Sequence, residues 1–196
     1  MTFDQETVAS TDSETGRGRP RDQERTAAIL DATHDMMKSK GWNDLTMGDI
    51  AKAAGCGLAT IYRRWNTKED LVAAAMRDRP LPLIDETGDA RTDLESLIAG
   101  LAAEMAQMGP SIIGFIAATQ SDQTLHEAFS EGVLTVARPR FGALLTDVLG
   151  DDNPHTDLLV DAICGSLIMR AGVLENLVSA ESWTAEVMAL VDELAA

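Results

Sequence analysis

Two short helical segments joined by a glycine-rich corner constrain this chain more than any other feature of its sequence. They lie within residues 46–65. Thr46 is placed to accept a backbone N–H at the start of the first segment, and the Asp49 carboxylate three residues later favours a helix start. Gly55 and Gly57 can adopt backbone angles that cost other residues free energy, so we expect the chain to turn sharply between the segments. The pattern predicts two short helices that cross, as in a helix-turn-helix.

The second of these segments has one apolar face and one face suited to DNA. Ile61 and Trp65 lie four residues apart and are expected to pack inward. The opposite side carries small, hydroxyl and guanidinium side chains, which fit base edges and phosphates. The residues that we predict to contact DNA from the motif are Thr46, Gly57, Leu58, Ala59, Thr60, Tyr62, Arg63 and Arg64.

Basic residues precede and follow the motif. Three arginines alternate with Gly18 and Pro20, which disfavour a helix, so we expect an extended arm along a phosphate backbone or in a minor groove. A charge cluster at a domain edge is the alternative. The arm residues are Arg17, Arg19 and Arg21. After the motif, Thr67 and Asp70 are spaced as a helix cap, and Lys68 in that first turn is expected to help hold a phosphate.

An amphipathic helix is predicted before the motif, from Asp22 to about Lys40, with apolar residues at helical spacing. Gly41 fits the C-terminal end of this helix. Within it, Asp31 and His34 have the spacing of a carboxylate–histidine metal pair. A metal site in a bundle needs partners from other helices, and no Glu-x-x-His occurs elsewhere, so we expect His34 at the surface.

The net charge of −16 argues against DNA binding, but its distribution does not. Residues 1–16 have four acids and no base, residues 17–79 have twelve bases and nine acids, and residues 80–196 have four bases and nineteen acids. Only the part around the motif is net basic, and a phosphate backbone would repel the remainder. This asymmetry fits a protein that is oriented on DNA, and equally a chain whose acidic helix faces keep it dissolved.

About sixty residues carry a more specific pattern, in order and without gaps. They are Ala28-Ile29-Leu30-Asp31-Ala32, Gly41-Trp42, Thr46, Asp49-Ile50-Ala51, Ala53-Ala54-Gly55, Thr60-Ile61-Tyr62, Trp65 and Lys68-Glu69-Asp70-Leu71. This pattern resembles the DNA-binding domain of the TetR/AcrR family of bacterial transcriptional regulators. The resemblance implies a three-helix domain, with residues 57–64 in the major groove and with Tyr62 and Lys68 on phosphates. Cys56, Ala59 and Arg63-Arg64 depart from the commonest pattern, so the operator sequence does not carry over.

The whole chain is predicted to be all-α. Glycine and proline recur at intervals typical of ordinary helices, and alternating runs of β-branched residues are absent. No apolar run approaches the ~18 residues needed to cross a bilayer, and the acidic N-terminus is unlike a signal peptide. We therefore expect a cytoplasmic protein without a membrane partner. Cys56 and Cys164 are far apart, which makes a disulfide framework unexpected.

We divide the chain into four parts. They are a disordered tail (1–16), the helix-turn-helix DNA-binding domain (17–79), a linker (80–90) and a C-terminal helical bundle (91–196). In the bundle, Gly109-Pro110 and Pro139 are expected to interrupt helices, because proline lacks the N–H that a helix uses. Asn153-Pro154 is expected to begin a helix, and Ser182 to cap the last one.

The resemblance implies that the C-terminal bundle binds a ligand and dimerises through its final two helices. Apolar side chains of its helices are candidates for lining a cavity, although an ordinary packed core is the alternative. The candidate contacts are Met105, Met108, Ile112, Ile116, Phe129, Phe141 and Met169, with Thr119, Gln120 and Arg170 as polar members. Arg170 is expected to pair with a carboxylate such as Glu175 or with an anionic group of a ligand.

No constellation for catalysis is visible in the sequence. G-x-S-x-G, HExxH and a glycine-rich phosphate loop are lacking, and three scattered histidines do not indicate a metal. We therefore expect no enzyme and no cofactor. The leading hypothesis is a homodimeric repressor that binds a palindromic operator in double-stranded DNA and is released by a small apolar or amphipathic ligand. A DNA-binding regulator controlled by its level or by a partner, and an activator, are the alternatives.

Overall fold

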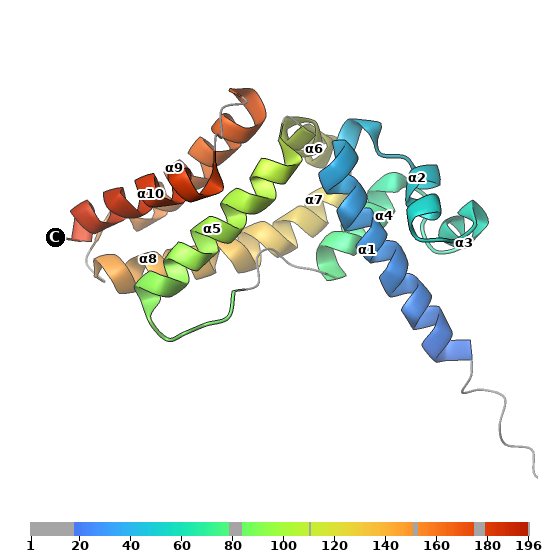
Figure 1. The fold of residues 1–196 in the computed structure, drawn as a ribbon, viewed down its shortest axis with the longest axis horizontal. Coiled ribbons are helices and arrows are strands. Elements are labelled where there is room, and N and C mark those ends of the chain that lie inside the picture. The colour runs from blue at the N-terminus through green and yellow to red at the C-terminus, as the bar shows by residue number, and fades with distance from the viewer. Residues whose placement is uncertain (1–17, 79–83, 110, 151–152, 175–178, 196) are drawn as a thin grey trace, which may run out of the picture.

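The computed structural model describes residues 18–78, 84–109, 111–150, 153–174 and 179–195. Within these residues the chain forms helices and no β-strand, which confirms the predicted all-α class. The elements are α1 (Gly18–Asp44), α2 (Met47–Ala53), α3 (Leu58–Tyr62), α4 (Lys68–Asp78), α5 (Ala90–Met108), α6 (Ser111–Ser121), α7 (Gln123–Phe129), η1 (Ser130–Ala137), α8 (Arg138–Leu149), α9 (Thr156–Ile168), η2 (Met169–Val173) and α10 (Ala180–Ala195), η1 and η2 being π-helical. Helices α2 and α3 lie at one end of the molecule, and α8 and α10 extend to the other (Figure 1).

The first helix begins earlier than the sequence predicts. Because α1 is helical from Gly18, the expected extended arm is wrong for residues 18–21, and Arg19 and Arg21 belong to a helix. Pro20 falls in the first turn of α1, where its fixed φ suits a helix and where an N–H has no helical partner to lose. Arg17 and the predicted tail lie outside the described residues.

A backbone break at Gly41 separates the long part of α1 from a short final turn. Gly41 has φ 72° and ψ 174°, which confirms the predicted helix end. A Cβ atom at this position would lie 2.3 Å from the Cβ atom of Ser111, at the start of α6. Gly114 makes a similar approach, because a Cβ atom there would lie 2.7 Å from Oδ1 of Asn43. The end of α1 therefore packs against α6 with almost no side chain between the two backbones.

Helices α1 and α4 join the N-terminal helices to the C-terminal bundle. Helix α4 packs along α7, and α1 contacts both α6 and α5. Within the bundle, α5 contacts both α8 and α10. The buried apolar side chains form one hydrophobic core that includes Ile50 and Ile61 of the N-terminal helices and Leu94 and Leu145 of the bundle. The packing of one part therefore depends on the packing of the other.

The predicted helix break at Pro139 is wrong, because α7, η1 and α8 form one continuous helical path. Arg138 has helical angles (φ −63°, ψ −47°), and its N–H donates to the carbonyl oxygen of Val133, five residues earlier. In a regular α-helix, Pro139 would clash with the carbonyl group four residues before it. The wider turn of η1 changes the position of the preceding carbonyl groups, so the proline fits without ending the helix.

Two helix starts in the bundle differ from their predicted positions. Helix α9 begins at Thr156 and not at Asn153-Pro154, because the Asn153 side chain accepts a backbone N–H at 2.9 Å and closes a turn first. The cap of α10 is Ser179, whose Oγ accepts the N–H of Ser182 at 2.9 Å. Ser182, the predicted cap, therefore lies inside the helix.

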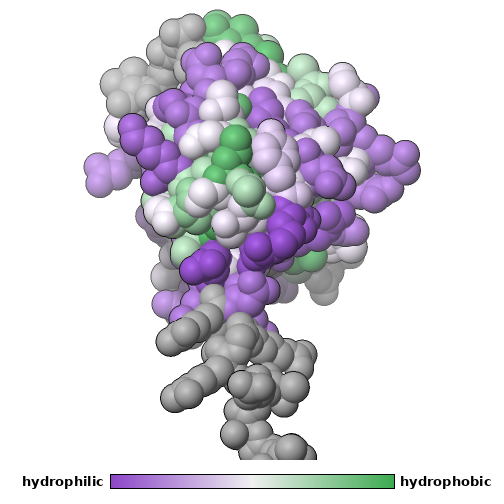
Figure 2. Space-filling model, turned by 90° about the vertical axis from the view of Figure 1, so that its right-hand side faces the viewer, coloured by the Kyte–Doolittle hydropathy of each residue, from purple (hydrophilic) through white to green (hydrophobic). Residues whose placement is uncertain are grey.

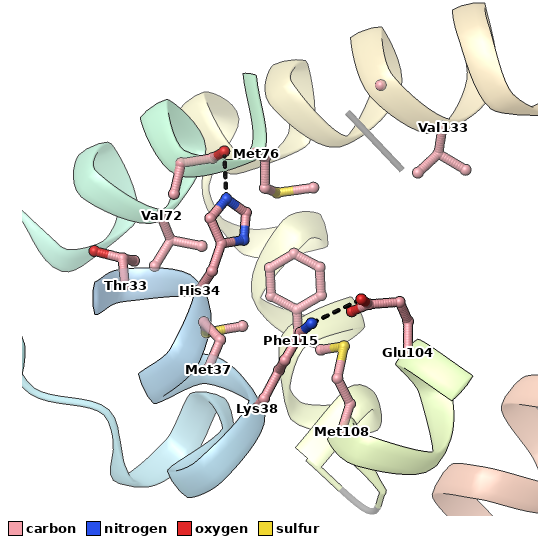
Figure 3. Close-up of a pocket in the computed structure, with 12 residues that line it drawn as sticks. Thr33, His34, Met37, Lys38, Val72, Met76, Glu104, Met108, Phe115 and Val133 are labelled. Carbon is pink, nitrogen blue, oxygen red and sulfur yellow. Dashed lines mark hydrogen bonds and ion pairs between the residues drawn. The ribbon is translucent and has the colours of Figure 1, made fainter. Parts of the chain in front are cut away.

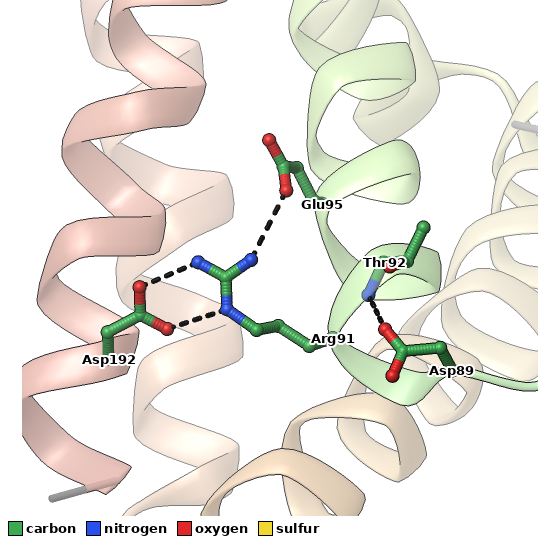
Figure 4. A network of polar contacts seen from close by, with 5 residues as sticks. All are labelled: Asp89, Arg91, Thr92, Glu95 and Asp192. Carbon is green, nitrogen blue, oxygen red and sulfur yellow. Dashed lines mark hydrogen bonds and ion pairs between the residues drawn. The ribbon is translucent and has the colours of Figure 1, made fainter.

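Polar contacts fix the start of α5 against its neighbours. Arg91 forms a bidentate ion pair with the Asp192 carboxylate of α10, with N–O distances of 2.9 and 2.7 Å (Figure 4). The buried carboxylate of Asp93 accepts hydrogen bonds from the backbone N–H and the hydroxyl of Thr87, at 2.8 and 2.7 Å. These bonds lower the pKa of Asp93. Thr87, in the predicted linker, is thus held against the bundle.

Candidate nucleic-acid interface and ligand cavity

The cap at Thr46 positions the first turn of α2. The Thr46 hydroxyl oxygen accepts the N–H of Asp49 at 3.1 Å and donates to Oδ2 of the same residue at 2.7 Å. Lys40 Nζ lies 2.8 Å from Oδ1 of Asp49. The hydrogen bond from Lys40, and then that from Thr46, lower the pKa of the Asp49 carboxyl group. The predicted cap is confirmed, and it also ties the end of α1 to α2.

The corner after α2 presents α3 to solvent. Gly55 has φ 62°, whereas Gly57 is extended with φ −76°, so only Gly55 needs the conformational freedom of glycine. Ile61 is fully buried and anchors α3, while the side chains of Leu58 and Tyr62 are 42% and 49% exposed. On the space-filling surface of this end of the molecule, a small apolar patch is surrounded by hydrophilic side chains (Figure 2).

The two arginines that follow α3 lie differently. Arg63 is exposed to solvent. The Arg64 side chain is only 13% exposed, because it forms an ion pair with Asp22 of α1 and donates to the carbonyl oxygen of Thr60 at 3.1 Å. The sequence predicts that both arginines contact DNA, but in this structure Arg64 is held against α1 and only Arg63 is presented.

Lys68 is held near α3 by the aromatic residue at the end of α1. Thr67 and Asp70 form the predicted reciprocal cap, with hydrogen bonds of 3.0 and 3.1 Å. Lys68 Nζ donates to the carbonyl oxygen of Trp42 at 3.0 Å and lies 4.0 Å from the centroid of its ring. Such a cation–π contact is worth about 0.5–1 kcal/mol at an exposed site. Lys68 therefore has to exchange these contacts for any phosphate that it binds.

We expect that replacing Asp22 with asparagine strengthens binding to DNA of any sequence. The substitution removes a negative charge beside α3 and releases Arg64. Each additional phosphate contact steepens the dependence of log affinity on log salt by about one unit. Fluorescence anisotropy with a duplex of arbitrary sequence, measured over a salt series, checks both effects. Asp35→Asn, at another exposed acid of α1, is the control, and an equal gain in that variant would contradict a specific role for the Asp22–Arg64 pair.

An apolar cavity of about 220 Å³ lies within the C-terminal bundle, and we call it the bundle cavity. It is bordered by α5, α6, α9 and the continuous helical path of α7, η1 and α8. Four of the predicted ligand contacts line it, namely Met105, Ile112, Ile116 and Phe129. Leu97 and Leu101 also line it, and these belong to the apolar stripe of α5 that is visible in the sequence.

Six of the predicted ligand contacts do not line the bundle cavity: Met108, Thr119, Gln120, Phe141, Met169 and Arg170. Thr119 and Phe141 are buried in packed core, and the Met169 side chain is 48% exposed. Arg170 lies 3.4 Å from the carboxylate of Glu186 of α10, while its predicted partner, Glu175, is outside the described residues. Helical periodicity identifies a buried face, but it does not identify the part of that face that borders a void.

The bundle cavity has a polar edge that the sequence does not predict. Arg138 lies 3.0 Å from a carboxylate oxygen of Asp161 and 3.1 Å from one of Asp157. Cys164 lines the same wall, and burial, together with the nearby Asp161 carboxylate, raises the pKa of its thiol. Two carboxylates beside one guanidinium give this edge an excess of negative charge, which disfavours an anionic ligand there.

A second cavity of about 90 Å³ lies where α1 and α4 meet α5, α6 and η1, and we call it the seam cavity (Figure 3). His34 Nε2 lies 2.9 Å from the carbonyl oxygen of Ala75 of α4. Lys38 of α1 forms an ion pair of 2.7 Å with Glu104 of α5. Met108, a predicted ligand contact, lines this cavity and not the bundle cavity. The prediction that His34 lies at the surface is wrong, because its ring is half-buried between α1 and α4.

The described part of the chain holds no group of three or more His, Cys, Asp or Glu residues that could bind a metal ion. No single helix there is both long enough and apolar enough to cross a membrane, and α5 with α6 meets that test only across a bend of 94°.

Comparison with known proteins gives matches over both parts of the chain. The family description "Bacterial regulatory proteins, tetR family" matches residues 29–75, and "Tetracyclin repressor-like, C-terminal domain" matches residues 84–193, more than half of the chain. The chain is 29% identical to the HTH-type transcriptional regulator YdeS of Bacillus subtilis over 164 residues, which cover 79% of this chain and 81% of YdeS. It is 28% identical to the DNA-binding transcriptional repressor TetR of Mycobacteroides abscessus over 142 residues, which cover 70% and 75% of the two chains.

A solved structure supports the same fold. The TetR transcription regulator from Haloarcula marismortui superposes with a TM-score of 0.64 at 19% identity, covering 87% of this chain and 98% of that one. These relatives are transcriptional regulators and not enzymes. The arrangement of α2 and α3, the helical C-terminal part and the family matches agree, and the chain therefore belongs to the TetR family of bacterial regulatory proteins, as a DNA-binding transcriptional regulator.

Proposed function

We propose that this regulator is a dimeric repressor of a palindromic operator in double-stranded DNA, and that a small apolar or amphipathic molecule in the bundle cavity releases it. The main support is that the cavity and the exposed face of α3 are connected by packed helices. Helix α6, which carries Ile112 and Ile116 into the cavity, contacts α1, and α4, which carries Lys68, packs along α7. A ligand that fits the DNA-incompetent conformation better shifts the population away from DNA. Such a protein works in the cytoplasm, where its operator is.

In the proposed complex, α3 enters the major groove. The exposed residues Leu58, Ala59 and Arg63 face base edges, with Gly57 and Thr60 close to the DNA backbone, and Tyr62, Thr46 and Lys68 reach phosphates. Arg64 joins them after it leaves Asp22. Arg17, Arg19 and Arg21, which precede the motif in the sequence, add positive charge to the DNA-binding domain. We keep the division into a DNA-binding domain (17–79), a linker (80–90) and a ligand-binding and dimerisation domain (91–196) as part of this proposal.

Exposed apolar side chains near the end of the chain support the dimer. They are Leu158, Met169, Val173, Leu174, Leu190 and Leu194, each at least 46% exposed. They lie on α9, η2 and α10 or directly after η2, and such a cluster of exposed apolar groups marks an interaction surface. Pairing of the last helices with their copies around a two-fold axis would place two α3 helices on one face of DNA, about 34–36 Å apart or somewhat more.

Replacing both Leu190 and Leu194 with aspartate is expected to give a folded monomer. The two side chains are 48% and 46% exposed in one chain, so charge there costs little folding stability but opposes burial in a dimer. Light scattering after gel filtration measures the mass, and circular dichroism measures the helix content. Leu58→Asp is the control for the mass measurement, because Leu58 is 42% exposed on α3, at the opposite end of the molecule from α10 (Figure 1). A dimeric double variant would contradict the proposed interface.

Selection of bound duplexes from a random DNA pool tests the proposed function. We expect one enriched palindrome, whose half-sites are separated by about one helical turn. The operator obtained then allows two further measurements: transcription from a promoter that carries it, and thermal denaturation of the protein against a compound library. Repression, and a compound that both raises the melting temperature and releases DNA, are the expected results. Activation, or the lack of any stabilising compound, would contradict the repressor or the ligand part of the proposal, respectively.

A further inference from the structure

We propose that the ligand is an elongated, mainly apolar molecule that occupies both cavities, with its body in the bundle cavity and one uncharged hydrogen-bonding end in the seam cavity. This inference rests on the proposed function and adds the shape and the chemistry of the ligand. It also places the end of the ligand against α1 and α4, the helices that connect the bundle to the DNA-binding end of the molecule.

The two cavities share a partition of side chains. Val133 of η1 lines both of them. Phe115 of the seam cavity and Phe129 of the bundle cavity are in edge-to-face contact, with ring centroids 6.4 Å apart. On α5, Met105 lines the bundle cavity and Met108, almost one turn later, lines the seam cavity. Methionine and phenylalanine side chains can change rotamer without backbone movement, so a chain-like ligand can pass between the cavities.

The volumes favour joint occupation. Small-molecule sites typically enclose about 300 Å³ or more. The bundle cavity, at about 220 Å³, and the seam cavity, at about 90 Å³, each fall below this range. Only the two together reach it. A molecule that spans the partition therefore buries more of its apolar surface than a molecule confined to either cavity.

The polar groups of the seam cavity favour an uncharged end group. Lys38 and Glu104 neutralise each other at 2.7 Å, and both side chains are 30% exposed. A hydroxyl or carbonyl group can hydrogen-bond to this pair without adding net charge. Because the pair is neutral as a whole, a carboxylate or an ammonium end would meet no net opposite charge there, and each would lose its hydration among Met37, Met76 and Phe115. The ion pair therefore indicates an alcohol, amide, ester or ketone end.

Straight-chain primary alcohols test this inference by NMR of the full-length protein labelled with ¹³C at its methionine methyl groups. The methionine signals are assigned by substitution with leucine. 1-Butanol should perturb Met105 alone, whereas 1-dodecanol should also perturb Met37, Met76 and Met108 of the seam cavity. Affinity should rise about fourfold for each methylene group that becomes buried. Dodecanoate and dodecylamine should bind at least tenfold more weakly than 1-dodecanol.

Gly132→Leu is the key variant, because Gly132 lines the seam cavity and not the bundle cavity. A Cβ atom at this position meets no other atom within 4 Å, so the larger side chain can extend into the seam cavity. The variant should bind 1-butanol like the wild type, which shows an intact bundle cavity, but lose the gain from longer chains and the signals at Met37, Met76 and Met108. Perturbation of Met105 alone at every chain length overturns this inference and leaves the proposed function standing. Perturbation of the seam methionines without Met105 indicates a separate small site and also overturns it. No perturbation by any alcohol overturns it and counts against the ligand part of the proposed function.

Discussion

A double variant in which alanine replaces Arg63 and phenylalanine replaces Tyr62 should lose specific operator binding, while its melting temperature stays almost unchanged. Both side chains project from α3 into solvent, and the residue that anchors α3 in the core is Ile61. An arginine at a base edge contributes about 1–3 kcal/mol, and the dimer presents it twice. We therefore expect operator affinity to fall by at least about a hundredfold, to the level of DNA of arbitrary sequence. Anisotropy titration with the selected operator measures this change.

Arg77→Ala is the matched control for this double variant. It also removes one positive charge from the N-terminal helices, but Arg77 is in the last turn of α4 and pairs with Glu131 of η1 at 2.6 Å. We expect Arg77→Ala to retain operator binding. If the double variant at Arg63 and Tyr62 binds the operator as tightly as the wild type does, α3 is not the recognition helix.

Replacing Gly41 with alanine should cause a large loss of stability for the addition of a single methyl group. Its φ of 72° and ψ of 174° fall in a region that is essentially confined to glycine, at a cost of about 1–3 kcal/mol for other residues. The new Cβ atom would lie 2.3 Å from the Cβ atom of Ser111, and forcing the helices apart adds about 1–3 kcal/mol. Chemical denaturation should show both terms as a lower free energy of unfolding.

Two further variants separate the two causes. Ser111→Gly combined with Gly41→Ala removes the steric conflict but not the backbone cost, so it should recover only part of the lost stability. Gly48→Ala adds a methyl group inside α2, where the nearest atom is the Thr46 hydroxyl oxygen at 3.7 Å. It should leave stability unchanged or raise it by up to about 1 kcal/mol, because alanine favours a helix. A Gly41→Ala protein as stable as the wild type would contradict the close packing of α1 against α6.

Local signals in the sequence are sufficient to predict much of the DNA-binding end. The caps at Thr46 and Thr67 and the helix end at Gly41 depend on residues a few positions apart, and all three are present in the structure. The errors at the two prolines arise because the effect of a proline depends on its place in the helix. The sequence predicts that Pro20 prevents a helix, but Pro20 lies in the first turn of α1, where proline is tolerated. It also predicts that Pro139 ends a helix, but the π-helical turn before Pro139 leaves space for its ring.

Contacts between residues that are far apart in the sequence cannot be predicted from such local signals. Arg64 and Asp22 are 42 positions apart, and His34 and Ala75 are 41 apart, so neither pairing has a local pattern that predicts it. The bundle cavity shows the same limit. The sequence identifies the apolar faces of α5 and α6, but the contribution of α9 and the polar edge at Arg138 depend on how the helices pack in three dimensions.

The Trp42–Lys68 contact also gives the protein a built-in optical probe. The indole ring contacts both the Lys68 ammonium, 4.0 Å from its centroid, and the ring of Phe115 on α6, whose centroid is 5.7 Å away. Indole emission responds to a nearby charge, so its maximum wavelength and its intensity should change when Lys68 moves to a phosphate or when a ligand displaces α6. With Trp65 and Trp183 replaced by phenylalanine, one unlabelled fluorophore would report DNA binding and ligand binding in real time.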